Sequence, residues 1–318
     1  MPTPPPSITP VDCYYHAEPE RAAAFLIEHD GRAAFVDNNT NRAVPRLMAA
    51  LEARRIAPDQ VDYLIVTHIH LDHSAGTAEL LRQCPNATVL AHPKAARHLI
   101  DPARLIAGTR AVYGEEAYER LYGEIAPVPE ERVRIMEDGA QLDWHGRALT
   151  FLHTRGHASH HLCIHDAGAN ALFAGDTFGL GRMASMRPGP AFTVCTSSPP
   201  EFEPDEARRS VRRILDTGAE WVYITHYGYF NDPETRAAQL LDSIGDMEAI
   251  GREAAATDLA GDALTAHCTE RVRAAFDAHL RACGIADPAA DLHWLHRDVD
   301  LNGMGLAIYA ERLRSAGQ

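Results

Sequence analysis

The stretch Thr67-His68-Ile69-His70-Leu71-Asp72-His73 places four potential metal ligands within six residues. It directly follows the apolar run Val61–Val66, whose length and composition predict a buried strand. Side chains alternate along an extended chain, so His68 and His70 are expected to point the same way. Asp72 and His73 lie where the chain turns into the next helix and can point at a second position nearby. The spacing therefore predicts two adjacent metal ions.

The residue types in this cluster favour a catalytic metal centre. Neutral imidazoles and carboxylates are ligands that suit Zn²⁺, Fe²⁺ and Mn²⁺. The cluster contains no cysteine, which argues against a closed structural zinc site. We therefore expect a site with an open position for water or substrate.

Three further segments carry ligand residues at the ends of predicted strands. They are Gly156-His157 after the strand that ends at His153, Gly175-Asp176-Thr177 after 171–174, and Thr225-His226 after 221–224. Two metal ions held by five histidines and two aspartates would use His68, His70, Asp72, His73, His157, Asp176 and His226.

The order H-x-H-x-D-H, then G-H, then G-D, then a final His resembles the metallo-β-lactamase superfamily over residues of about 11 to 230. The resemblance implies an α/β fold, a four-layer αβ/βα sandwich with the site at the edge of two sheets. It also implies the ligand assignment. His68, His70 and His157 would hold the first metal, Asp72, His73 and His226 would hold the second, and Asp176 would bridge them.

Within the superfamily, three motifs resemble a group of hydrolases whose chemistry is unassigned. They are T-H-I-H-L-D-H, G-H-A-S-H-H and T-H-Y-G, which begin here at Thr67, Gly156 and Thr225. The resemblance therefore implies a fold and a metal site but no substrate. Two features depart from the family pattern: Arg155 stands where many relatives have proline, and His160-His161 crowd the following strand.

The expected activity is metal-dependent hydrolysis of a small ester, lactone, thioester or amide. Two divalent ions, with Zn²⁺ favoured and Fe or Mn as alternatives, lower the pKa of a bridging water so that a hydroxide attacks the substrate. Asp72 is the predicted catalytic residue, because it would orient that hydroxide and take its proton.

Other functions remain open alternatives. A mononuclear-iron oxidoreductase of the sulfur dioxygenase type shares H-x-H-x-D-H, and metal content would separate it from a hydrolase. Flavin-dependent di-iron relatives are disfavoured because they carry Glu at the position of His70. A phosphodiesterase is disfavoured by charge, and a non-catalytic metal-binding scaffold is disfavoured by the intact ligand set. β-Lactamase action is not favoured, because those enzymes are exported and no signal peptide is recognised.

Composition limits the class of partner. The 318 residues include 30 Lys+Arg and 44 Asp+Glu, for a formal net charge of -14. An acidic surface repels phosphate backbones, so we expect a small-molecule substrate and no nucleic acid. Apolar runs are too short for a membrane span, and the six scattered cysteines are typical of thiols in a reducing compartment. The predicted location is the cytoplasm, and a homodimer is one expected assembly.

Strand and helix patterns alternate twice up to about residue 232, and long helical patterns follow. We therefore predict a catalytic domain over 1–232 and a helical extension over 233–318. Because every predicted ligand precedes residue 233, metal binding is expected to survive removal of the extension. Residues 1–10 are expected to be flexible, and a hairpin is expected around His29-Asp30-Gly31.

The segment 176–205 is rich in Gly, Pro and Ser, which favours a lid or binding loop. Arg182 or Arg187 is expected to border the pocket, together with Tyr227, Tyr229 and Phe230.

Three further features favour structural explanations over functional ones. Asp298 to Gly303 imitates the start of a calcium loop but has Tyr309 where a bidentate Glu is required, which favours a polar turn before a final helix. Nothing basic adjoins Cys195 to activate its thiol. The remaining histidines between 145 and 165 are expected in supporting hydrogen bonds or at exposed strand positions, with a catalytic role for His160 or His161 as the alternative.

Overall fold

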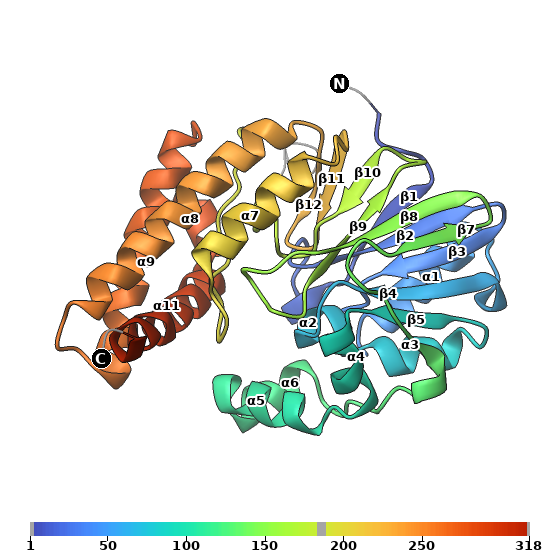
Figure 1. The fold of residues 1–318 in the computed structure, drawn as a ribbon, viewed down its shortest axis with the longest axis horizontal. Coiled ribbons are helices and arrows are strands. Elements are labelled where there is room, and N and C mark those ends of the chain that lie inside the picture. The colour runs from blue at the N-terminus through green and yellow to red at the C-terminus, as the bar shows by residue number, and fades with distance from the viewer. Residues whose placement is uncertain (1–2, 183–188, 317–318) are drawn as a thin grey trace. The chain divides into compact units, whose positions relative to one another are not determined.

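A computed structural model of the chain describes residues 3–182 and 189–316 (Figure 1). The chain divides into two compact units. The first contains residues 1–153, 160–175 and 217–231, and the second contains 154–159, 176–216 and 232–318. The second unit thus takes in two segments that precede the boundary predicted at residue 232, and the division into domains at that residue stays a prediction.

In the first unit, the described residues form two six-stranded sheets. The first sheet has the order β1-β2-β3-β4-β5-β6, antiparallel from β1 to β3 and parallel from β3 to β6. Its strands are β1 (Ile8–Asp12), β2 (Ala23–His29), β3 (Arg32–Val36), β4 (Val61–Val66), β5 (Thr88–Ala91) and β6 (Val133–Ile135).

The second sheet has the order β12-β11-β10-β9-β8-β7, and β10 and β11 are its parallel pair. Its strands are β7 (Gln141–Trp144), β8 (Arg147–His153), β9 (Leu162–Asp166), β10 (Ala171–Phe173), β11 (Trp221–Ile224) and β12 (Gly228–Phe230). β8, β10 and β11 end between two and four residues before a predicted metal ligand.

Alternation along β2 explains how the first sheet is covered on both faces. Phe25 points toward the second sheet, where its ring lies 5.6 Å from that of Phe173 and 5.3 Å from that of Tyr223. Its neighbours Ala24 and Leu26 point the other way, into a cluster formed with helices α1 (Val44–Ala53), α3 (Thr77–Gln83) and α4 (Pro93–Ile100). Burial on both faces fixes the register of the strand.

The remaining helical segments of the first unit lie near the predicted ligands or on the surface. They are α2 (Leu71–Ser74), α5 (Ala103–Tyr113), α6 (Glu115–Leu121) and the 3₁₀ turns η1 (Tyr15–Ala17), η2 (Pro58–Gln60) and η3 (Glu130–Arg132). α2 is only one turn long, so its position depends on what packs around it.

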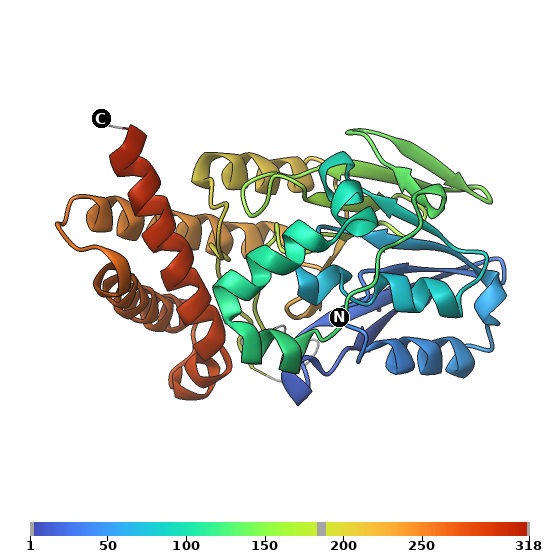
Figure 2. The ribbon, with the colours of Figure 1, turned by 90° about the horizontal axis from the view of Figure 1, so that it is seen from below.

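The second unit is helical. Its helices are α7 (Pro204–Leu215), α8 (Pro233–Ala255), α9 (Gly261–Ala282), α10 (Ala289–Trp294) and α11 (His296–Ala316). α8, α9 and α11 pack against one another, and α7 packs on α8 (Figures 1 and 2). The Arg314 guanidinium donates to carbonyl oxygens in the last turn of α8, those of Ala254 at 2.8 Å and Ala255 at 3.0 Å. These bonds satisfy carbonyl groups that a helix end leaves without partners.

Several described residues of the segment between Asp176 and α7 bond to the C-terminal helices. The carbonyl of Thr193 lies 2.9 Å from Nε2 of His279 in α9, and the amide of Cys195 donates to Ser243 of α8 at 3.0 Å. An isolated bridge also pairs Leu180 with Val194. This part of the predicted lid is therefore ordered by the extension.

Most predicted elements are confirmed, including the hairpin at Asp30-Gly31, where both residues have positive φ, and the strand Val61–Val66. Two predictions are wrong. Residues 8–10 are not flexible, because they begin β1, an edge strand in which Pro10 is tolerated. Residues 298–303 are not a turn, because they lie inside α11.

Within residues 3–182 and 189–316, no helix has both the length and the apolar character needed to cross a bilayer.

Candidate metal centre

The predicted cluster lies at the carboxyl end of β4. The extended residues after Val66 bring His68 and His70 together, with Nε2 of His68 3.0 Å from Nδ1 of His70. His68 is buried and His70 is half-buried, so the pair is reachable from one side. The prediction that these two histidines face the same place is confirmed.

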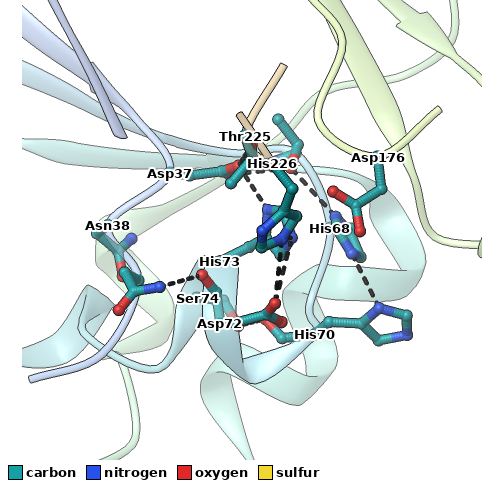
Figure 3. A network of polar contacts seen from close by, with 12 residues as sticks. Asp37, Asn38, His68, His70, Asp72, His73, Ser74, Asp176, Thr225 and His226 are labelled. Carbon is teal, nitrogen blue, oxygen red and sulfur yellow. Dashed lines mark hydrogen bonds and ion pairs between the residues drawn. The ribbon is translucent and has the colours of Figure 1, made fainter. Parts of the chain in front are cut away.

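A second group gathers Asp72, His73 and His226, whose ligand atoms all lie within 4.8 Å of one another (Figure 3). Oδ2 of Asp72 is 3.2 Å from Nε2 of His226 and 3.9 Å from Nε2 of His73. The two Nε2 atoms are 3.3 Å apart. Residues from α2 and from the end of β11 thus converge on one point.

Hydrogen bonds at the far side of each ring set the tautomers of this group. Nδ1 of His73 lies 2.7 Å from Oδ2 of Asp37, and Nδ1 of His226 lies 2.6 Å from the carbonyl oxygen of Arg21. A carboxylate and a carbonyl can only accept, so both Nδ1 atoms carry the proton. In neutral rings, both Nε2 lone pairs then face each other beside the Asp72 carboxylate. Three electron-pair donors directed at one point fit a divalent cation.

Asp37 is a functional residue that the sequence analysis missed. Its side chain is 1% exposed and accepts hydrogen bonds from His73 and from the hydroxyl of Thr225 (Figure 3). It also accepts from the amide and the hydroxyl of Thr67. Its φ of 57° lies in the left-handed region, which is uncommon for residues other than glycine. A signal was present, because Asp37 directly follows β3 and the carboxyl ends of the parallel strands β3 and β4 meet at one edge of the sheet.

The loop after Asp37 holds the back of α2. The amide of Asn38 donates to the His73 carbonyl at 2.9 Å, and Nδ2 of Asn39 donates to the Asp72 carbonyl at 2.7 Å. Gly76 completes this contact, because a Cβ there would lie 3.0 Å from the carbonyl oxygens of Asn38 and Thr40. The ligand-bearing turn is thereby fixed from one side.

Histidines outside the predicted ligand set also lie beside it. The ring of His161 is fully buried and stacks on His68 at 4.8 Å, and the ring of His160 is 5.7 Å from that of His70. Gly175 has a φ of 49°, and a Cβ at that position would lie 2.6 Å from Nε2 of His161. Glycine is therefore required at position 175, because the neighbouring ring of His161 leaves no room for a side chain.

The predicted ligands His157 and Asp176 belong to the second unit, where they lie together. Nε2 of His157 is 3.5 Å from Oδ2 of Asp176, and both residues are buried. Gly156 has a φ of 123°, and a Cβ there would lie 2.3 Å from the backbone nitrogen of Ala207 in α7. Along the chain His157 follows β8 and Asp176 follows β10, both strands of the first unit.

The described residues that were expected to border the pocket make contacts with other side chains or are buried. Arg182 lies 3.4 Å from Oδ1 of Asp291 and over the ring of Trp294 at 5.6 Å, within the second unit. Tyr227 and Phe230 are buried, and the ring of Tyr229 lies 5.4 Å from that of Tyr223. The prediction for Arg187 falls outside the described residues.

The prediction that Cys195 is unreactive agrees with its surroundings. Burial raises the pKa of the Cys195 thiol to about 12, so the thiol stays protonated at neutral pH.

Residues 17–226 match the sequence profile of the Metallo-beta-lactamase superfamily, so the chain belongs to this superfamily. The predicted metallo-β-lactamase fold is thereby confirmed. Two solved structures are similar across nearly the whole chain. A superfamily protein from Sulfolobus tokodaii has a TM-score of 0.65 and 19% identity over 96% of this chain and 99% of that one. A family protein from Thermus thermophilus has a TM-score of 0.64 and 22% identity over 98% and 94%.

Among curated relatives, a hydroxyacylglutathione hydrolase from Aeromonas salmonicida is 29% identical over 168 residues, which are 52% of this chain and 50% of the relative. The chain spans about half the length of the curated relatives of this name that it matches.

Proposed function

We propose that the chain is a binuclear metal-dependent hydrolase acting on a small ester or thioester. The observation that carries the proposal is the convergence of Asp72, His73 and His226, with both Nδ1 atoms committed to acceptors. This arrangement leaves three electron-pair donors at one point, a set that suits Zn²⁺, Fe²⁺ or Mn²⁺.

The proposed ligands are the seven predicted from the sequence. Asp72, His73 and His226 would hold one ion, and His68, His70 and His157 would hold the other, with Asp176 shared by both. Zn²⁺ is the favoured ion. The 3.0 Å pair His68–His70 and the 3.5 Å pair His157–Asp176 support this set, because each pair already brings two proposed ligands together.

When bound, the ions supply Lewis acidity and lower the pKa of a coordinated water. The chain supplies orientation and proton handling. Asp72 would accept a proton on a carboxylate oxygen and release it toward the leaving group. Its Oδ2 atom lies 3.2 Å from Nε2 of His226, within the second ligand group. Asp37 holds the ring of His73 in one tautomer throughout.

A thioester is the first substrate to test within the proposed range of esters, lactones, thioesters and amides. The curated relatives named hydroxyacylglutathione hydrolase support this choice, although they match only about half of their own length. The net charge of -14 supports a small-molecule substrate over a nucleic acid.

The test is elemental analysis of the purified chain coupled to a substrate panel. The panel contains a hydroxyacyl thioester of glutathione, an aryl ester, a lactone, a β-lactam and a phosphodiester. Two equivalents of metal and turnover of a carboxylic ester or thioester are expected. Turnover of the phosphodiester alone, or a single iron with oxygen-dependent thiol oxidation, would contradict the proposal.

The role of Asp72 is tested by Asp72→Ala. We expect kcat to fall by about a hundredfold or more, because the substitution removes both a ligand and the proton acceptor. Asp216→Ala, which removes an exposed carboxylate at the end of α7, is the matched control and should leave kcat unchanged. Equal kcat values for the two variants would refute the assignment.

A further inference from the structure

Two buried tyrosine hydroxyls meet beside the second ligand group. The oxygens of Tyr15 and Tyr122 are 2.7 Å apart, and the two side chains are 8% and 4% exposed. They come from segments 107 residues apart in sequence, since Tyr15 begins η1 and Tyr122 follows α6. The bond therefore joins the loop between β1 and β2 to the end of α6, within the first unit.

This pair belongs to a small cluster that surrounds the ligand-bearing turn. Tyr15 and Tyr122 pack with Leu71 and Ala75, the residues that flank Asp72 and His73 in and after α2. A helix of one turn has few internal hydrogen bonds and takes its position from its neighbours. The loop after β3 holds one side of α2, and the tyrosine cluster packs against it as well.

The same loop also reaches His226. Near the end of this loop, the carbonyl oxygen of Arg21 accepts a hydrogen bond from Nδ1 of His226 at 2.6 Å. One segment, residues 13–21, thus contacts the turn that carries Asp72 and His73 through Tyr15, and contacts the third ligand through Arg21.

The backbone of this segment is strained. Four residues other than glycine have φ between 54° and 59°: Tyr14, His16, Ala17 and Glu20. The Asp12 carboxylate accepts from the amides of Tyr14 at 3.0 Å and Glu20 at 3.2 Å, which helps to maintain this shape. Residues in such conformations persist only where surrounding contacts determine them, and they cluster at functional sites.

We propose that Tyr15 and Tyr122 are a positioning pair for the metal held by Asp72, His73 and His226. Their hydrogen bond ties the strained loop to the end of α6, and both rings pack on Leu71 and Ala75. The pair thereby fixes the separation between the Asp72 turn and the ring of His226. The inference rests on the proposed function, because it assumes that this group binds metal. Burial, with smaller contributions from Tyr15, Tyr113 and Asp72, raises the pKa of Tyr122, so the phenol remains a hydrogen-bonding group and not a base.

The test compares Tyr15→Phe, Tyr122→Phe and the double variant with Tyr118→Phe. Tyr118 lies in the same cluster with its ring 5.6 Å from that of Tyr122, but its hydroxyl is not part of the pair. Each purified protein is stripped of metal and titrated with Zn²⁺ against a chromophoric chelator, and its melting temperature is measured without metal. The readout is metal affinity and not turnover.

In either variant of the pair we expect one of the two zinc ions to bind about ten- to a hundredfold more weakly, with the other unchanged. The double variant should lose no more than the singles, because the two hydroxyls act as one unit. Tyr118→Phe should retain both affinities. If both pair variants keep both affinities within twofold of the wild type, or lose both equally, the inference is wrong.

A failure of the proposed function gives a different result. A wild-type chain that binds no zinc would overturn the proposed function and, with it, the metal role of the pair. A wild-type chain that binds two ions, with variants that match it, would overturn the pair alone. If the wild type binds one ion, weakening of that ion in Tyr122→Phe but not in Tyr118→Phe supports the pair, and no change refutes it.

Discussion

Asp37 connects three parts of the chain through a single buried carboxylate, and its partners are Thr67, His73 and Thr225. A carboxylate that accepts from the distal nitrogen of a ligand imidazole fixes the orientation of the ring and raises its basicity. Substitution of Asp37 is therefore expected to weaken metal binding as well as to change stability, and the two effects can be measured separately.

We predict that Asp37→Asn weakens metal binding about ten- to a hundredfold, because the amide keeps the shape but removes the charge that orients His73. The matched control is Asp62→Asn. Asp62 also accepts from side chains, those of Arg32 and Trp144, but belongs to neither ligand group. The control should lower stability and leave metal affinity unchanged. Competition with a chelator measures the first effect and urea unfolding the second, and similar metal affinities in the two variants would contradict this account.

Sequence alone predicted much of the centre at the level of residues, because strand ends and ligand types are local features. The second position shared by Asp72 and His73 follows from this reasoning, whereas the grouping of His226 with them was implied by the resemblance to the superfamily. Asp37 could not be found in the same way, since its role depends on which strands become neighbours. The same is true of Tyr15 and Tyr122, which lie in segments without any ligand motif.

Two glycines in helices differ in the space that a methyl group would have at their Cα atoms. A Cβ on Gly305 would lie 1.7 Å from the carbonyl oxygen of Ser197, whereas a Cβ on Gly245 in α8 would meet no atom within 4 Å. Both glycines lie in helices of the second unit.

We predict opposite effects of alanine at these two positions. Gly305→Ala should lower the free energy of unfolding by about 1–3 kcal/mol, because α11 must move away from Ser197. Gly245→Ala should raise it by about 0.5–1 kcal/mol, because alanine has the higher helix propensity and nothing obstructs it. Urea unfolding of both variants checks the pair, and a stabilised Gly305→Ala would show that the helix and the segment are not in contact.

The elements that sequence patterns predicted least well are those whose place depends on distant packing. The proline-rich start of the chain gave no strand signal at β1. β1 forms nevertheless, because an edge strand tolerates the backbone N–H that Pro10 lacks. The acidic run at 298–303 has the composition of a turn, but it lies in α11, where Asn302 bonds to Ser197. Local composition cannot report such a partner.

For the whole molecule, buried histidines predict how stability depends on pH. Burial, with smaller contributions from His153 and Lys94, lowers the pKa of His92 from 6.5 to about 4. Burial also lowers the pKa values of His165 and His279. The unfolded chain binds protons at these imidazoles below about pH 6.5 while the folded chain does not, so stability falls as pH falls from about 6.5 to about 4.

We therefore expect the urea midpoint of the metal-free protein to decrease from pH 7 to pH 4.5. His92→Gln should flatten this decrease, because it removes a group that the unfolded state protonates. His293→Gln, at an exposed position of α10, should retain the wild-type slope. Identical slopes in all three proteins would count against the assignment to His92.

The structure changes what truncation after Asp232 is expected to do. From the sequence, metal binding should survive, since every proposed ligand precedes that point. In the second unit, however, residues 189–203 bond to side chains of the extension such as Arg236, Ser243 and His279. We now predict an aggregated protein with less than the full metal content, because Asp176 adjoins a segment left without its partners. Size-exclusion chromatography and metal analysis test this, and a monodisperse, fully loaded truncation would refute it.

The hydrogen bond from Thr225 to Asp37 spans 188 residues, and it has a consequence for how the chain is made. Synthesis at roughly 5–20 residues per second separates the appearance of these two residues by about 10 to 40 seconds. During that interval the Asp37 carboxylate lacks one of its donors, and the group of Asp72, His73 and His226 has only two members. If this group holds a metal as proposed, its loading must follow the synthesis of His226 and is therefore a late event. The ions present after His226 has been made, and not those present when synthesis begins, would then decide which metal the group first takes.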